Sequence, residues 1–189
     1  MNIIDLPQDD ESVIEQTARV VLEAFRGISP SWPTMEAAIE EVRESFTEGR
    51  ISRVAIDDDG AVVGWISGQP MYDGHVWELH PLAVAPQAQN HGIGRKLVED
   101  LEAQVAARGG VTLWLGSDDE DFTTSLGGVD LYPEPLAHLA NIKNLRGHPF
   151  EFYQKVGFHL CGVLPDANGP GKPDIFMAKR IGRLGELKG

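Results

Sequence analysis

The chain has 189 residues, the size of one ordinary domain that can bury a core of its own. It carries 29 acidic against 16 basic side chains, for a formal net charge of −13. This charge argues against nucleic acids and anionic membranes as partners, and no apolar run approaches the ~20 residues that span a bilayer. Two interpretations of the charge remain open, simple solubility and a polycationic substrate.

The N-terminal segment and the cysteine content bear on the compartment. Residues 1–10 are acidic and contain no basic stretch followed by an apolar one, so they do not have the pattern of a secretory signal. Cys161 is the only cysteine, which excludes an intrachain disulfide and fits a reducing cytoplasm. We therefore predict a cytoplasmic protein.

The first half of the chain alternates strand and helix patterns. In chain order these predict a strand at residues 3–6, a helix over 11–25, a second helix capped by Thr34 with its apolar face from Met35 to Phe46, a β-hairpin of 52–57 and 61–68, and a strand at 76–84. A helix over 92–108 follows, and Gly109-Gly110 ends it.

The second half begins with an apolar strand at residues 111–116 and an acidic irregular stretch over 117–135. Helices are predicted at 136–145 and 149–156, and strands at 158–164 and 174–181. Only the middle of the chain alternates β-α-β, so we predict an α+β fold with a mixed sheet. We expect a single domain over residues 1–189, of which the last ~8 residues form a disordered tail.

A glycine-rich turn between the strand at 76–84 and the helix after it is the strongest local signal. It reads Gln89-Asn90-His91-Gly92-Ile93-Gly94-Arg95-Lys96. A helix N-terminus presents unpaired N–H groups and partial positive charge, and the two glycines let a pyrophosphate approach the backbone. A turn that only packs a helix against a strand is the alternative for Gly-x-Gly alone.

Two other phosphate motifs do not fit this turn. The sequence lacks the Gly-Lys-Ser/Thr of nucleotide-triphosphate loops, and Leu97 stands where a dinucleotide fingerprint needs its third glycine. The whole pattern Val84-x-Pro86-x-x-Gln89-x-x-Gly92-Ile93-Gly94 instead resembles the acetyl-CoA motif of the GNAT acetyltransferase superfamily. The resemblance implies the GNAT fold, a twisted and mostly antiparallel mixed sheet flanked by helices, with acetyl-CoA held at residues 82, 84 and 89–96.

A second stretch, Phe152-Tyr153-Gln154-Lys155-Val156-Gly157-Phe158, resembles the other recurrent GNAT motif. It implies that Tyr153 lies at the cofactor and protonates the departing CoA thiolate. The alternative for Tyr153 by itself is a core aromatic at a helix end. Arg146 stands where many members have an asparagine, with Asn144 near but out of register, so that asparagine contact is not carried over.

Longer phrases resemble one subgroup, the chromosomal enterococcal-type aminoglycoside 6′-N-acetyltransferases, from about Arg50 to Lys179. They include Trp77-Glu78-Leu79-His80-Pro81-Leu82, Leu115-Gly116-x-Asp118-Asp119, Asn144-Leu145-Arg146-x-His148-Pro149, Glu151-Phe152-Tyr153, Gly162-Val163-Leu164-Pro165 and Lys172-Pro173-Asp174-Ile175. The subgroup implies a homodimer and direct attack of the 6′-amine on acetyl-CoA in a ternary complex.

The resemblance also implies roles for residues of the strand at 76–84. Glu78 matches the candidate general base, which a protonated amine requires before it can attack. His80 shares the side-chain parity of Glu78 and would position substrate or relay a proton. The backbone N–H of Leu82 would stabilise the oxyanion, and Trp77 would contact substrate. As alternatives, Glu78 is an exposed strand residue or an electrostatic anchor, and His80 is structural.

By itself, the acidic run at residues 118–121 is a solvated loop. Beside such a site, its carboxylates would line the place where a polycation binds. We rank Asp118 and Asp119 first because they follow the strand end directly. Cys161 is expected in the core rather than as a nucleophile, and no spacing indicates a metal site. Two further functions stay open: a GNAT enzyme for another cationic amine (a polyamine, a metabolite or a protein lysine), and a non-catalytic CoA-binding module.

Overall fold

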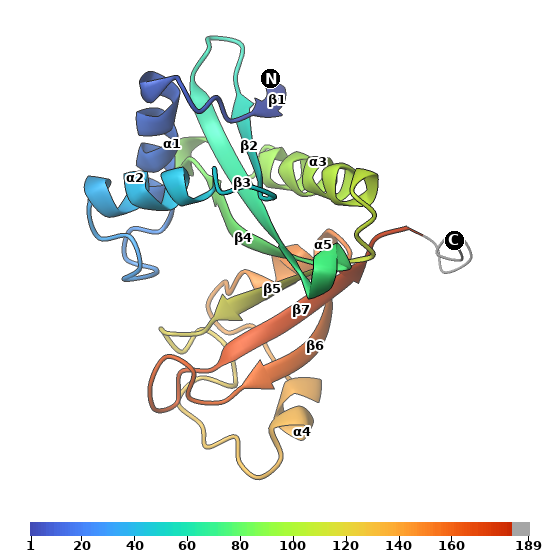
Figure 1. Cartoon of the computed structure of the whole chain (residues 1–189). Helices are drawn as coiled ribbons and strands as arrows, with labels where there is room; N and C mark the ends of the chain where they lie inside the picture. Colours follow the sequence, from blue (N-terminus) through green and yellow to red (C-terminus); the bar gives the residue numbers. More distant parts are fainter. Residues whose placement is uncertain (183–189) are drawn as a thin grey trace. The chain divides into compact units, whose positions relative to one another are not determined.

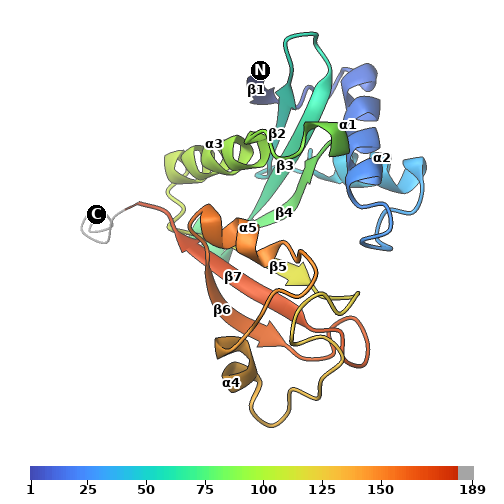
Figure 2. The ribbon, with the colours of Figure 1, turned by 180° about the vertical axis from the view of Figure 1, so that it is seen from behind.

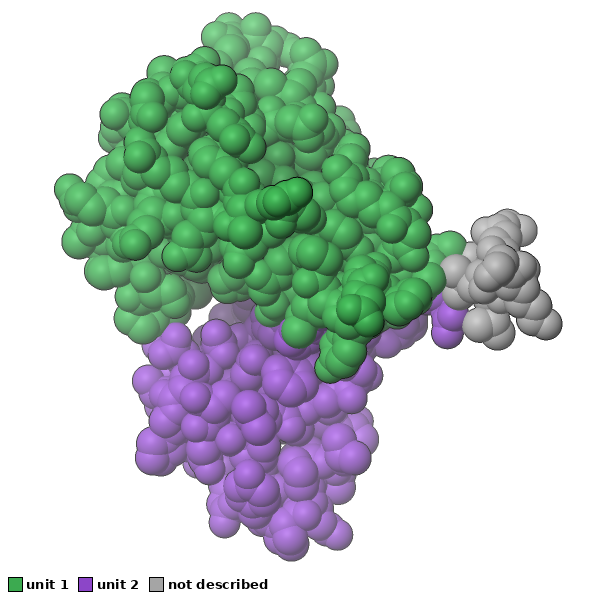
Figure 3. Space-filling model, viewed as in Figure 1, with its two compact units in different colours: residues 1–113, 181–189 green, residues 114–180 purple. Residues whose placement is uncertain are grey.

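The computed structural model describes residues 1–182. By contacts the chain divides into two compact units, residues 1–113 with the chain end from Ile181, and residues 114–180 (Figure 3). The predicted disordered tail lies outside the described residues, apart from Gly182. One domain over 1–189 remains a prediction.

The first unit holds four strands and three long helices. They are β1 (Asn2–Asp5), α1 (Glu11–Ala24), α2 (Met35–Glu44), β2 (Ile51–Ile56), β3 (Val62–Met71), β4 (Val76–Val84) and α3 (Ile93–Ala107), with short 3-10 turns η1 (Tyr72–Gly74) and η2 (Pro86–Ala88). The strands lie in the order β1-β2-β3-β4, and each neighbouring pair is antiparallel. The elements predicted for this half are confirmed to within a few residues.

Helices cover both faces of these four strands, with α1 and α2 on one face and α3 on the other (Figures 1 and 2). Trp65 of β3 belongs to the core beneath α1 and α2. Gly64 and Gly68 of the same strand face α3, where an added Cβ would lie 2.9 Å from Leu97 and 2.8 Å from Leu101. The absence of side chains there lets α3 pack directly on the sheet.

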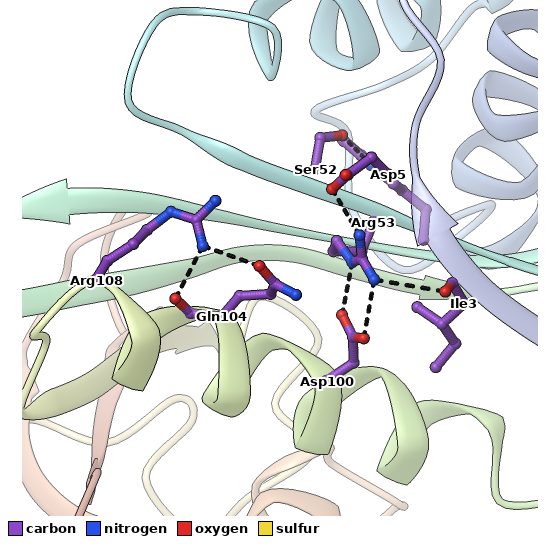
Figure 4. Close-up of polar contacts among 8 residues, drawn as sticks. Ile3, Asp5, Ser52, Arg53, Asp100, Gln104 and Arg108 are labelled. Carbon is purple, nitrogen blue, oxygen red and sulfur yellow. Dashed lines mark hydrogen bonds and ion pairs between the residues drawn. The ribbon is translucent and has the colours of Figure 1, made fainter.

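Arg53 of β2 connects this strand to α3 and to the neighbouring strand β1 (Figure 4). Its guanidinium donates to both carboxylate oxygens of Asp100, at 2.7 and 3.1 Å, and to Asp5 at 2.6 Å. A fourth hydrogen bond reaches the carbonyl of Ile3 at 3.4 Å. This charged network fixes the helix whose N-terminus forms part of the candidate site.

The second unit holds three strands and two short helices. They are β5 (Thr112–Asp118), α4 (Pro135–Ala140), α5 (Phe150–Lys155), β6 (His159–Leu164) and β7 (Asp174–Arg180), with the strand order β5-β7-β6. β6 and β7 are antiparallel, with a bulge between Leu160 and Gly162. The predicted α+β class with a mixed, mostly antiparallel sheet is confirmed.

Two predictions for this unit are wrong. The helix expected over 136–145 ends at Ala140, because the next residues pair with residues 123–125 instead: Ser125 donates to the carbonyl of Lys143 at 2.9 Å, and Leu145 to that of Thr123 at 2.8 Å. Cys161 is exposed rather than in the core, because it lies at the bulge of β6. Partial desolvation raises the pKa of its thiol, so it is no activated nucleophile.

Candidate active site

A β-bulge in β4 shapes the first part of the site. Gly68 pairs with Leu79, but Ile66 pairs with Leu82, so Ser67 alone faces two residues, His80 and Pro81. One extra residue reverses the side-chain alternation beyond it. Glu78 and His80 therefore share the face that carries α1 and α2, whereas Leu82 lies on the face of α3 with Ile66.

The register also orients the backbone at the end of β4. Ala85 donates to the carbonyl of Val63 at 3.0 Å, which makes these two residues a hydrogen-bonded pair. Hydrogen-bonded and non-hydrogen-bonded pairs alternate in antiparallel strands. The N–H groups of Leu82 and Val84 therefore point away from β3, toward the opposite edge of β4. This orientation is what an oxyanion contact from Leu82 requires.

The N-terminus of α3 differs from those of the other long helices. Asp10 accepts hydrogen bonds from the first turn of α1, and Thr34 from that of α2. The N-cap of α3 is Gly92, which has no side chain to serve as a cap and whose φ of 82° favours glycine. A Cβ added there would meet nothing within 4 Å, so this helix end is open to an anion.

The rest of the predicted phosphate loop surrounds that helix end. The residues at 89–92, 95 and 96 are exposed, whereas Ile93 and Gly94 are half-buried. Asn90 has a φ of 63°, and the side chain of Gln89 donates to the carbonyl of Val84 at 3.1 Å. Arg95 and Lys96 add positive charge beside the open helix end, a combination that suits a pyrophosphate.

Glu78 and His80 have different neighbours on their shared face. The half-buried Glu78 accepts a hydrogen bond from Gln69, the residue of β3 with which it is paired. His80 lies near two residues of the α1–α2 side: its Nε2 is 4.0 Å from Oε1 of Glu41, and its ring centre is 5.9 Å from that of Trp32. Sequence reasoning missed Gln69, Glu41 and Trp32, because only the pairing of β3 with β4 and the packing of α2 bring them here.

Trp77 does not fit its predicted contact with substrate. Its side chain is 3% exposed and lies on the α3 face, opposite to Glu78. Its Nε1 donates to the carbonyl of Gly74 at 3.0 Å, and a Cβ on Gly110 would lie 2.7 Å from the indole. Strand alternation decides this correction, because adjacent residues cannot both face the same side. Trp77 is a core residue.

Asp118 ends β5 and Asp119 follows it, and the two have opposite surroundings. Asp118 is exposed, and its side chain accepts a hydrogen bond from Asn168. Asp119 is 1% exposed and accepts four hydrogen bonds, from the backbone N–H and the hydroxyl of both Thr123 and Thr124. Desolvation opposes its charged form, but these bonds outweigh it and lower the pKa of the carboxyl. Asp119 holds its loop, and the prediction that it contacts substrate is corrected.

His148 connects the end of β5 to the start of α5. Its Nδ1 accepts from the N–H of Phe150 at 3.1 Å, so Nε2 carries the hydrogen and donates to the carbonyl of Asp118 at 3.1 Å. Burial lowers the pKa of this imidazole, partly offset by the bond to Asp118. Asn144 bonds to the backbone of His148 twice, at 2.9 and 2.8 Å, and Arg146 donates to the carbonyl of Phe122 at 2.9 Å.

Tyr153 lies in α5 of the second unit, in an aromatic group with Phe152 and Phe158 at ring distances of 5.2 and 5.7 Å. Burial raises the pKa of its phenol well above the usual range. The hydroxyl therefore stays protonated at neutral pH, which is the form that a proton donor needs.

Comparison with known proteins adds an independent line of evidence. The acetyltransferase (GNAT) family model matches residues 18–127 of the chain. The chain belongs to the GNAT acetyltransferase family. Comparison with curated protein sequences gives no match.

Solved structures resemble the chain over almost all of its length. An aminoglycoside 6′-N-acetyltransferase complexed with coenzyme A is 39% identical, with a TM-score of 0.89 over 97% of this chain and 98% of the other. The aminoglycoside 6′-N-acetyltransferase from Enterococcus faecium is 40% identical, with a TM-score of 0.87 over the same shares. An aminoglycoside 6′-acetyltransferase type Ii is 35% identical, with a TM-score of 0.74 over 97% and 99%.

None of the helices in residues 1–182 combines the length and apolar character that crossing a membrane requires. Over the same residues, no three or more His, Cys, Asp or Glu side chains gather as a metal site would need.

Proposed function

We propose that this GNAT protein transfers the acetyl group of acetyl-CoA to the 6′-amine of aminoglycosides, by direct attack within a ternary complex. The observation that carries the proposal is the 39% identity, over 97% of the chain, to a 6′-N-acetyltransferase complexed with coenzyme A. The open N-terminus of α3 gives it a physical basis, because this helix end has the donors that a pyrophosphate needs.

Each residue then has a defined task. The loop at 89–96 binds the pyrophosphate of acetyl-CoA, which supplies the acetyl thioester. Glu78 removes a proton from the ammonium, directly or through a water molecule, and the freed amine adds to the carbonyl carbon. The N–H of Leu82 donates to the oxygen on which negative charge develops, a contact typically worth ~3 kcal/mol of barrier. Tyr153 gives its proton to the departing thiolate.

The negative charge of the protein supports a cationic acceptor. Asp118 is an exposed carboxylate at the start of the acidic run, and we assign it to contact an ammonium of the substrate. We further propose that the protein acts in the cytoplasm as a homodimer and confers aminoglycoside resistance. Light scattering of the purified protein and drug susceptibility of an expressing host test these assignments.

The decisive experiment follows thiol release from acetyl-CoA with a panel of aminoglycosides that carry an amine or a hydroxyl at position 6′. Turnover restricted to the 6′-amino compounds is the expected result. If the protein binds CoA and acetylates polyamines or peptide lysines instead, it is a GNAT enzyme for another cationic amine. Binding of CoA without turnover of any amine would make it a non-catalytic module.

A further inference from the structure

A carboxylate of α2 lies against His80, and the proposed reaction gives it no role. The side chain of Glu41 is 17% exposed, and that of His80 is 52% exposed. Oε1 of Glu41 is 4.0 Å from Nε2 of His80, within ion-pair range and slightly beyond a hydrogen bond. A small movement of the imidazole brings the two into hydrogen-bond contact.

Trp32 fixes the orientation of this carboxylate. Its indole Nε1 donates to Oε2 of Glu41 at 3.0 Å, and its ring packs edge-on against Phe25 at 4.7 Å. Because Trp32 is only 9% exposed, the indole is a rigid donor. It occupies Oε2 and leaves Oε1 directed at His80, so the arrangement resembles a carboxylate that orients a functional imidazole.

We propose that Glu41 is a positioning residue for the acceptor amine and acts through His80; this inference rests on the proposed function. Glu41 holds the imidazole with its hydrogen on Nε2, directed at Oε1. The lone pair of Nδ1 then accepts an N–H of the acceptor ammonium. Glu78 projects from the same strand face and removes the proton from the amine that His80 has oriented.

The variant Glu41→Gln tests this without removing the contact to Trp32. The glutamine oxygen still accepts from the indole, but its NH₂ group then faces Nε2 of His80. Two donors cannot share a hydrogen bond, so the imidazole is driven to the opposite tautomer, with its hydrogen on Nδ1. That tautomer cannot accept from an ammonium.

We expect E41Q to lower kcat/KM for 6′-amino aminoglycosides about tenfold, as the loss of an orienting partner typically does. Affinity for CoA stays unchanged. Glu40→Gln is the matched control, because Glu40 is the exposed neighbour on the same helix and loses the same charge. E40Q should retain wild-type kcat/KM, and an equal loss in both variants would reduce the effect to net charge and overturn the proposal.

A double-mutant cycle separates action through His80 from direct action on substrate. In the His80→Gln background, E41Q should change kcat/KM by less than about twofold, because the group it positions is gone. A full tenfold loss in that background would mean that Glu41 contacts the substrate or the fold directly, and would overturn the proposal. Wild-type activity of E41Q would also overturn the proposal.

A spectroscopic measurement keeps the inference testable even if the proposed function fails. Nitrogen NMR of His80, at a pH where the ring is neutral, reports which nitrogen carries the hydrogen. We expect Nε2–H in the wild type and Nδ1–H in E41Q. If the wild type acetylates no aminoglycoside but the tautomer of His80 differs between the wild type and E41Q as expected, the proposed function fails and the positioning by Glu41 stands. If His80 has the same tautomer in both proteins, the proposal that Glu41 positions it is overturned.

Discussion

The two units of the molecule use their polar groups differently. In the first, the N-terminus of α3 has no side-chain cap, and Glu78 accepts a hydrogen bond from Gln69 alone among the described residues. In the second, Asp119 accepts four hydrogen bonds and both ring nitrogens of His148 are engaged. Asp119 is therefore not available to a cation, although it belongs to the acidic run at residues 118–121. Hydrogen-bond occupancy, rather than charge count, indicates where a cation can bind.

The largest effect is expected for Glu78→Gln. Removal of the general base should lower kcat/KM about a thousandfold, equivalent to ~4 kcal/mol of barrier. The melting temperature should stay near that of the wild type, because the half-buried side chain makes one hydrogen bond to the sheet. Steady-state kinetics and a thermal scan measure both. A large loss of stability with normal turnover would remove the distinction between the two units.

For Asp119→Asn we expect a loss of stability with little loss of activity. An amide reproduces only part of the acceptor capacity that Thr123 and Thr124 use, so the free energy of unfolding should fall by about 3 kcal/mol. Urea denaturation measures the loss, and kcat per folded molecule should change little. Asp121→Asn is the matched control, since Asp121 is exposed and loses the same charge. Comparable destabilisation by D121N would contradict the structural role of Asp119.

Tyr153 is a residue of the second unit with a proposed catalytic role. Tyr153→Phe keeps the aromatic packing with Phe152 and Phe158 but removes the proton for the leaving thiolate. We expect kcat to fall about a hundredfold with little change in stability. The variant should recover much of its rate with an acetyl thioester whose thiol has a low pKa, because that thiolate departs without being protonated. If the rate is not recovered, proton donation is excluded as the role of Tyr153.

The smallest effect is a pH dependence of stability that arises from His148. Its pKa in the folded protein is lowered from the ordinary 6.5, so the unfolded chain binds the proton more tightly. Stability is therefore full above pH ~6.5 and decreases as the pH falls below it, by up to about 1.4 kcal/mol per pH unit from this group. Urea unfolding at pH 7.5 and 5.5 should show the loss. His148→Gln should be less stable at pH 7.5 and should lack this part of the slope.

Local patterns predicted most elements, but four predictions differ from the structure. Residues 141–145 continue a helical pattern, yet Lys143 and Leu145 pair with the backbone of residues 123–125. Trp77 and Asp119 stand beside functional residues in the sequence, but strand alternation and four local hydrogen bonds turn both inward. Cys161 appears apolar in its strand and is exposed by a bulge. The ending of the helix at Ala140 and the exposure of Cys161 come from pairing with distant segments, whereas the places of Trp77 and Asp119 come from local geometry that motif matching alone does not consider.

The sequence by itself determined the family, the glycine-rich turn at the start of α3 and the parity of Glu78 with His80. These depend on motifs and on the period of a strand, which a linear chain contains in full. Only the tertiary structure decided which carboxylates are available and which neighbours they have. Glu41 is separated from His80 by 38 intervening residues, and Trp32 by 47, so no local pattern could join them. Their proximity comes from the packing of α2 against the sheet, whose free energy arises from the burial of the whole apolar face.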